Sequence, residues 1–285
     1  MKKIVLLLFI IGLNGSCQEY GKLTLVTSLP NLVKEVSGME MLPQSDYLWM
    51  VNDSGNAPTV YGYSISSEKI ERSILLKTDN IDWEDLASDP SGNLYIGDFG
   101  NNNNKRKDLV IYTVKQPAVE HSTGVKASQT TFYFEDQKKF PPKRKNRTFD
   151  LEAFIYFKGH FYLFSKNRSS KFDGITKLYR LPAQRGHFKA ELIGTFKTCE
   201  KVKNCQVTAA AIHHPTGKVA LLSHDKVWIF SDYTEDNFFS GNVEKIKLGH
   251  HSQKESIAFK NATELYISDE GSAIFGGNLY VLSLD

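Results

Sequence analysis

Two carboxylates at one end of a predicted hairpin have the spacing to do chemistry together. Glu84 opens a β-prone run, a turn follows at Asp89–Asn93, and the apolar run Leu94–Ile96 leads to Asp98. Turn residues between two such runs predict a β-hairpin. The start of its first strand lies beside the end of its second, so Glu84 and Asp98 are expected to face one place.

The hairpin recurs along the chain, and each copy opens at a comparable position: Glu40, Glu84, Glu152, Thr208 and Glu255. A third strand candidate follows each hairpin, and a fourth follows the first four. The opening positions are separated by 44, 68, 56 and 47 residues. Repeats of roughly 40–50 residues are typical of propeller blades, and the excess of the longest falls in the loop Asp136–Phe149. The pattern therefore favours five blades over six.

The two ends of the chain complete the pattern. The fifth unit ends at Asp285 before its fourth strand, while the strand candidate Lys22–Thr27 has no unit of its own. The sequence predicts an all-β, five-bladed β-propeller over residues 18–285, a single domain whose last blade is closed by the N-terminal strand. A β-sandwich or two small β domains are the alternatives, but neither explains a repeated Glu at the strand start.

Met1–Cys17 has the pattern of a targeting segment. Lys2 and Lys3 precede the apolar run Ile4–Leu13, which is too short to span a bilayer comfortably. Cys17 after Gly-Ser resembles a bacterial lipobox, and this implies cleavage before Cys17 and lipidation of its thiol. The chain is expected to be exported to the cell envelope as an outer-membrane lipoprotein, held to the membrane by lipid alone. Because Asn14 is an imperfect residue for the motif, simple secretion stays open.

The remaining cysteines, Cys199 and Cys205, form an even pair within one loop. In an exported protein this predicts a disulfide, since Cys-x5-Cys without a second pair lacks the spacing of a zinc site. The net charge is only +3. This balance argues against nucleic acid as a partner, and a monomer is expected.

In a propeller the first strand of each blade lines the central channel. Four carboxylates and a hydroxyl would then surround the axis, and such carboxylates repel one another unless a cation lies among them. Oxygen ligands suit calcium or magnesium, and calcium tolerates irregular cages better. A calcium site is therefore predicted at Glu40, Glu84, Glu152, Thr208 and Glu255. The alternative is that these Glu side chains cap backbone groups or bind only water.

Long polar loops are expected on the Glu-bearing face of the ring, and they carry many cations. These include Lys105–Lys107, Lys138, Lys139, Lys143–Lys145, Arg147, Lys166 and Arg168. A divalent cation with a cationic rim suits an anionic ligand such as phosphate. His224 ends a second strand and could reach the channel mouth.

The repeats Ser-Gly-Met-Glu-Met-Leu and Asp-Trp-Glu-Asp-Leu-Ala, with Gly-Asp-Phe-Gly-Asn-Asn, resemble a family of exported bacterial propeller proteins of unassigned function. More distantly, the layout is similar to the five-bladed calcium-activated nucleotidases. That resemblance implies calcium held by Glu84, Glu152, Thr208 and Glu255, with Asn52-Asp53 near a catalytic water. Glu40 departs from it, since a Ser is expected there.

Two functions follow, and the sequence leaves both open. The first is a surface module whose loop crown binds a glycan, peptide, protein or small anion, with Phe99, Phe172 and Phe275 as exposed aromatics. The second is a calcium-dependent hydrolase of phosphoanhydrides or phosphoesters. In it Asp53 or Asp98 orients water, and Lys166 or Arg168 stabilises developing charge.

Overall fold

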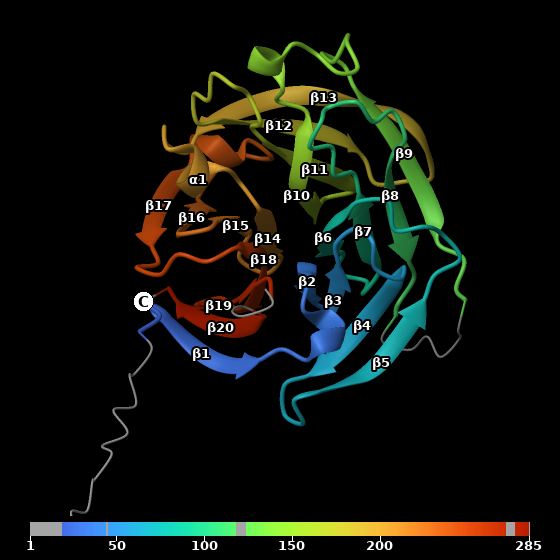
Figure 1. Ribbon diagram of the computed structural model, residues 1–285, viewed down its shortest axis with the longest axis vertical. Helices are drawn as coiled ribbons and strands as arrows, with labels where there is room; N and C mark the ends of the chain where they lie inside the picture. Colours follow the sequence, from blue (N-terminus) through green and yellow to red (C-terminus); the bar gives the residue numbers. More distant parts are fainter. Residues whose placement is uncertain (1–18, 44, 118–123, 272–276, 285) are drawn as a thin grey trace, which may run out of the picture.

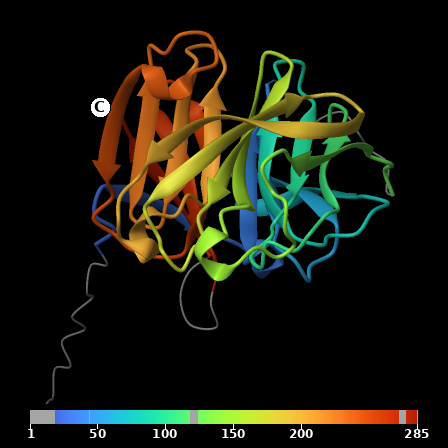
Figure 2. The same cartoon turned by 90° about the horizontal axis from the view of Figure 1, so that it is seen from above.

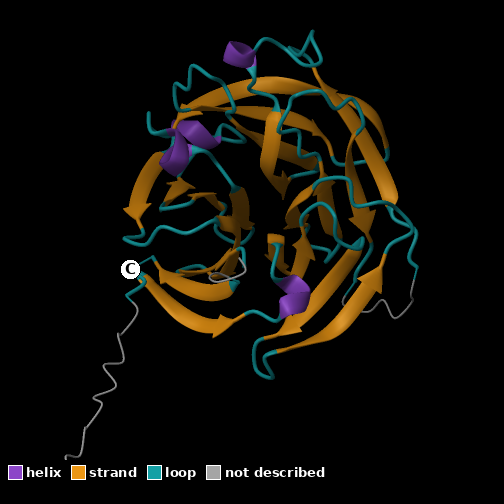
Figure 3. Cartoon of the chain, in the orientation of Figure 1, coloured by secondary structure: helices purple, strands orange, loops and turns teal. Residues whose placement is uncertain are grey.

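The computed structural model describes residues 19–43, 45–117, 124–271 and 277–284. The predicted leader Met1–Cys17, with its lipidation site, therefore lies outside the described residues. Within them, no helix is both long and apolar enough to cross a membrane. Strands dominate the ring, and the helical turns η1 (Asn31–Val33), η2 (Arg144–Asn146), α1 (Val202–Cys205) and η3 (Phe238–Ser240) lie in connecting segments (Figure 3).

The described residues form twenty strands, arranged in antiparallel runs of four. The first two runs are β2 (Val36–Met41), β3 (Tyr47–Asn52), β4 (Thr59–Ser64), β5 (Lys69–Leu75), and β6 (Trp83–Ser88), β7 (Leu94–Asp98), β8 (Leu109–Val114), β9 (Ser128–Phe134). The next two are β10 (Asp150–Phe157), β11 (His160–Lys166), β12 (Ile175–Pro182), β13 (Gly186–Lys197), and β14 (Ala209–His213), β15 (Lys218–Ser223), β16 (Lys226–Ser231), β17 (Asn242–Lys247).

The last run is completed by the N-terminal strand. β18 (Lys254–Asn261), β19 (Glu264–Asp269) and β20 (Asn278–Ser283) are followed in the sheet by β1 (Leu23–Ser28), which pairs antiparallel with β20. The predicted closure is thus confirmed. β9 and β13 also pair in parallel, which joins their two runs into one eight-stranded sheet; the five-blade interpretation counts those runs separately.

The runs form a ring with β2, β6, β10, β14 and β18 at its centre (Figure 1). Five apolar clusters fill the spaces between neighbouring runs, and one contains Met39 and Tyr61 from the first run with Ala258 and Leu279 from the last. The ring is therefore closed, and the all-β propeller prediction is confirmed, whereas the β-sandwich alternative is wrong.

Burial changes from the axis to the rim. Every residue of β6 is buried, because an inner strand is covered on both faces, whereas the outer strand β5 alternates between exposed and covered positions. The inner strands also come very close: a Cβ at Gly38 would lie 2.7 Å from the backbone of Asp85. A side chain at position 38 would therefore push β2 away from β6.

The two faces of the ring carry different connections. Seen from the side in Figure 2, η2 and α1 lie at one end and η3 at the other. The first two belong to connections between runs, and the last joins a third strand to a fourth. A disulfide joins Cys199 to Cys205 beside α1, with 5.4 Å between the Cα atoms, which confirms the predicted bridge.

Candidate functional site

A β-bulge recurs near the start of the inner strands. Pairing with the second strand skips Ser37 in β2, Glu84 in β6, Glu152 in β10 and Glu255 in β18. A bulge leaves one residue outside the ladder and redirects its side chain. All four of these residues line a single cavity at the mouth of the channel.

That cavity has a volume of about 280 Å³. Its walls come from the bulges, from the ends of second strands, from loops between second and third strands and from the loops between runs. The lining residues are Ser37, Asp53, Glu84, Asn102, Glu152, Lys166, Arg168, Gln206, His224, Gln253, Glu255 and Glu270. Five carboxylates therefore face two permanent cations, so the cavity has an excess of negative charge.

One side of the mouth is a cluster of three carboxylates. Asp53 follows β3, Asp82 precedes β6 and Glu84 occupies its bulge, and one oxygen from each lies within 4.8 Å of the others. Glu84 is only 7% exposed, and no side chain or backbone N–H of the described residues donates to its carboxylate. A Cβ at Gly100 would lie 2.1 Å from Glu84 Oε1 and 2.4 Å from Asp82 Oδ2. Only a glycine thus lets the chain pass this closely.

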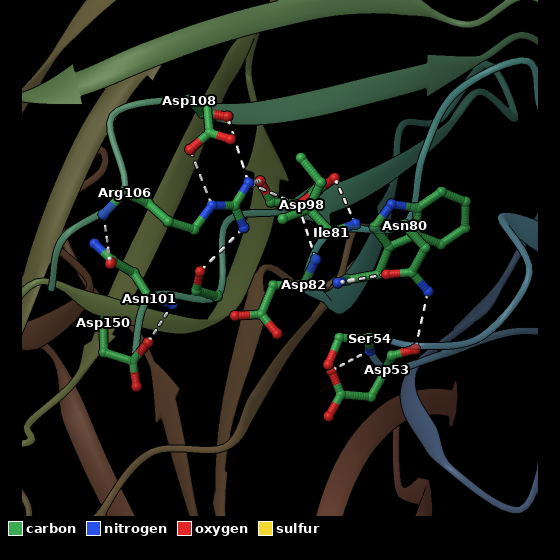
Figure 4. Close-up of polar contacts among 12 residues, drawn as sticks. Asp53, Ser54, Asn80, Ile81, Asp82, Asp98, Asn101, Arg106, Asp108 and Asp150 are labelled. Atoms are coloured by element: carbon green, nitrogen blue, oxygen red, sulfur yellow. Dashed lines mark hydrogen bonds and ion pairs between the residues drawn. The ribbon is translucent and has the colours of Figure 1, made fainter. Parts of the chain in front are cut away.

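Buried polar contacts hold the segment that carries Asp82. The carboxylate of Asp98 accepts hydrogen bonds from the N–H groups of Ile81 (3.3 Å) and Asp82 (3.1 Å), and it forms an ion pair with Arg106 (2.9 Å) (Figure 4). Asn80 donates to the carbonyl oxygen of Asp53 (2.9 Å). These contacts fix Asp82 and Asp53 relative to each other and leave the Asp82 carboxylate without a hydrogen bond in the network drawn.

The part of the mouth next to the three-carboxylate cluster, formed by β10 and β11, is cationic and internally paired. Lys166 Nζ lies 2.5 Å from Glu152 Oε2 and 3.9 Å from Glu255 Oε2. Arg168 donates to Asp150 Oδ2 (2.6 Å) and to Glu152 Oε1 (2.7 Å). Lys166 and Arg168 therefore neutralise Glu152 and its neighbours but do not reach the three-carboxylate cluster as partners.

His224 borders the same cavity, as the end of its strand suggested. Its Nε2 lies 3.4 Å from Glu255 Oε1 without hydrogen-bond geometry. Burial raises the pKa of Glu255, but the charges of Lys166 and Arg168 and the nearby imidazole of His224 outweigh it and hold the pKa below its usual value. This part of the mouth therefore carries an ionised carboxylate next to an imidazole.

Burial and the excess of carboxylates raise the pKa values of three acids at the mouth. Burial, followed by repulsion from Glu152 and Asp53, raises the pKa of Glu84 well above its usual value. Burial and the charge of Asp53 raise the pKa of Asp82 to about 6. Burial and Glu255 raise the pKa of Glu270 to about 7. A bound cation would relieve this repulsion.

Two residues of the predicted metal ring have other roles. Glu40 lies toward the opposite end of β2, where its carboxylate accepts a hydrogen bond from the N–H of Met41 (3.0 Å), and the channel mouth receives Ser37 in its place. Thr208 stands directly before β14, and its N–H donates to the carbonyl oxygen of Leu222 beside the pair Ala209–Leu222. Thr208 therefore occupies, in the fourth run, the position that the bulge residues occupy in the other four. Its hydroxyl donates to the carbonyl of Lys254 (2.8 Å).

The predicted catalytic residues also divide. Asp53, Lys166 and Arg168 line the cavity, whereas Asp98 is fully buried against Arg106 and acts on the site through the backbone of Asp82. Asp82 itself was missed, although it stands two residues before Glu84. Phe99, expected to be exposed on the crown, is instead fully buried in the core, and Phe275 lies outside the described residues.

No protein-family model matches the chain, and no curated protein matches it. Among solved structures, a gluconolactonase from Xanthomonas campestris is similar with a TM-score of 0.48 and 9% identity, over 92% of this chain and 89% of that one. A PQQ-bound aldose sugar dehydrogenase from Streptomyces coelicolor is similar with a TM-score of 0.49 and 11% identity, over 90% of this chain and 95% of that one. Virginiamycin B lyase from Staphylococcus aureus with quinupristin has a TM-score of 0.42 and 12% identity, over 90% of this chain and 69% of that one. No activity is assigned from similarity of this degree.

Proposed function

We propose that the protein holds a divalent cation at the mouth of its channel, on Asp53, Asp82 and Glu84, and binds a small anionic ligand beside it. The observation that carries the proposal is the approach of the three carboxylates to within 4.8 Å around Glu84, which is buried and accepts no hydrogen bond within the described chain. Like charges this close, with Glu84 buried among them, are stable together only with protons or a cation among them.

The donor set selects the cation. Three carboxylates supply only hard oxygen atoms, which calcium and magnesium prefer, and no cysteine or histidine belongs to the cluster. Ser37 and Asn102 border the same cavity and offer neutral oxygen atoms. Calcium accepts such an irregular mixture more readily than magnesium, which requires a nearly octahedral set.

The anionic ligand is supported by the other side of the cavity. Lys166 and Arg168 lie within the same 280 Å³ space as the acidic cluster. A ligand anion between them would meet the cation on one side and the guanidinium on the other. Export and lipid anchoring stay predictions from the sequence of Met1–Cys17.

A second candidate function is hydrolysis of a phosphoester or phosphoanhydride, and His224 is the observation that favours it. Its imidazole borders the cavity beside the ionised Glu255, and such a pair can hold or accept a proton from water. A bound divalent cation would polarise a phosphate oxygen. Arg168 would then orient the phosphate, and Asp53 would position the water.

Calcium titration by calorimetry and thermal melting of the chain from Gln18 onward tests the first proposal. We expect calcium to raise the melting temperature of the wild type, and Glu84→Gln to weaken calcium binding about 10- to 100-fold. Glu40→Gln is the matched control, because this Glu also lies on an inner strand but outside the cavity. Equal calcium affinity in the two variants, both folded by circular dichroism, contradicts the proposal.

A panel of nucleotides and phosphoesters then separates binding from hydrolysis. If hydrolysis occurs, His224→Gln should abolish it while leaving calcium binding within about threefold of the wild type. If no substrate turns over while the wild type binds calcium and phosphate, the protein is a binding module.

A further inference from the structure

The ten residues Lys138–Arg147 concentrate positive charge. They contain six Lys or Arg and no Asp or Glu, in a chain whose net charge is +3, so the rest of the chain is net negative by three. This segment belongs to the long connection between β9 and β10, which also accounts for the longest spacing between hairpins. The chain therefore places its excess of cations in one loop.

The loop is held in place by the neighbouring connection. Backbone bonds join Arg168 N to Arg147 O (3.0 Å) and Ser170 N to Arg144 O (3.1 Å). The hydroxyl of Ser169 donates to the carbonyl of Lys145 (2.7 Å). The loop thus lies against the segment that carries Arg168, at the outer edge of the ring (Figure 1), and the backbone that carries its lysines is fixed in place.

These lysines surround a cavity of about 680 Å³, lined by Lys138, Lys139, Lys143, Lys145 and Lys177 among others. Of these five, only Lys177 forms an ion pair with a carboxylate of the described residues, Asp136 at 2.6 Å. Lys138 donates to the carbonyl of Glu135 (2.5 Å). Asp136 is the one carboxylate among the lining residues and is paired with Lys177, so the other four lysines form no ion pair within the described part of the chain, which favours an anionic ligand.

An aromatic cavity of about 360 Å³ adjoins the first, and Lys138 lines both. It presents Tyr133 and Phe140, which are 45% and 37% exposed. Lys107 Nζ lies 5.0 Å from the centre of the Phe140 ring. Exposed rings among lysines offer apolar surface to a ligand that also carries charge.

We propose that these two cavities together bind a linear acidic glycan, with its carboxylate or sulfate groups on the lysines and its sugar C–H faces on Tyr133 and Phe140. The concave shape disfavours a flat anionic bilayer. The predicted export of the protein disfavours a phosphodiester chain. The site is separate from the channel cation and does not require it.

Binding of oligogalacturonate and of dextran sulfate, measured by calorimetry in the presence of EDTA, tests the proposal. We expect both to bind and neutral dextran not to bind. The triple variant Lys139→Gln, Lys143→Gln, Lys145→Gln should weaken binding at least tenfold. A control that removes three exposed lysines elsewhere, Lys22→Gln, Lys69→Gln, Lys245→Gln, should change it less than twofold, and Phe140→Ala should weaken oligogalacturonate about threefold or more.

Several results overturn the proposal. An equal loss of glycan affinity in the two triple variants would mean that only net charge matters. Unchanged binding in Phe140→Ala would show that the ring does not contact the sugar. Tighter binding of single-stranded DNA or of phosphatidylglycerol vesicles through the same lysines would assign the surface to those partners instead. Since EDTA is present throughout, a failure of glycan binding leaves the calcium proposal untouched. A failure of calcium binding likewise leaves the glycan proposal untouched.

Discussion

At the scale of single residues, Gly100 decides how closely the Glu84 and Asp82 carboxylates can lie. A methyl group there would be 2.1 Å from Glu84 Oε1, so Gly100→Ala should spread the cluster and weaken calcium binding about tenfold or more. Gly194→Ala is the control, because its added Cβ meets Phe239 at an ordinary 3.5 Å. Calorimetric titration of both variants measures the difference, and equal affinities would remove the cluster from the cation site.

Glu40 gives a prediction on pH that does not involve the cation. Burial raises the pKa of Glu40 from its usual value of 4.5 to about 8, although the backbone N–H groups of Met41 and Ser88 oppose the shift. The folded protein therefore keeps a proton that the unfolded chain releases, and this contribution to stability is lost as pH rises from about 4.5 through about 8.

Glu40→Gln should consequently be close to neutral at pH 5 and stabilising at pH 9, by up to about 4 kcal/mol. Urea denaturation of wild type and variant at the two pH values, with EDTA present, measures the change. If the stability difference is the same at both, the Glu40 carboxyl does not titrate in this window.

At the scale of elements, the bulges and the turn before β6 build the site. Arg106 pairs with the fully buried Asp98 and donates to the carbonyl of Gly100 (3.0 Å), so it holds both sides of the segment that presents Asp82. Arg106→Gln would leave a buried carboxylate without its cation. Such a change costs about 3 kcal/mol or more, and it should also weaken calcium binding.

Arg180→Gln is the control for this change, because Arg180 pairs with Asp236 on the outer surface with both side chains about one-third exposed. Its loss should cost no more than about 1 kcal/mol. Chemical denaturation ranks the two variants. A result in which Arg180→Gln is the more damaging would show that the Asp98 contacts do not anchor the turn.

At the scale of the whole molecule, the strand β1 closes the ring. Leu23 faces Leu282 across the sheet and is buried in the cluster between the fourth and fifth runs, whereas Leu25 in the same strand is 38% exposed. Leu23→Ala should lower the free energy of unfolding by about 2–4 kcal/mol, and Leu25→Ala by less than about 1 kcal/mol. Equal, small effects would mean that closure contributes little to stability.

Much of this architecture can be predicted from the sequence, because each hairpin carries its own local signal. Apolar runs and turn residues mark the strands, and the lone strand at the N-terminus marks the closure of the ring. Aligning the repeats is enough to predict that Glu84, Glu152 and Glu255 lie at the same level along the channel axis. Their common place at the channel mouth follows from strand direction alone.

The tertiary structure decided which residues meet there. A bulge adds one residue whose effect on pairing is invisible in a strand pattern, and it brings Ser37 rather than Glu40 to the mouth. Superposing Met39 on Leu86, Phe154 and Ile257 would have found Ser37, because each apolar residue lies two positions after its bulge. Asp82 and the burial of Asp98 depend on contacts between a turn, a loop and two strands. Such contacts depend on the packing of the closed ring and carry no local signal in the sequence.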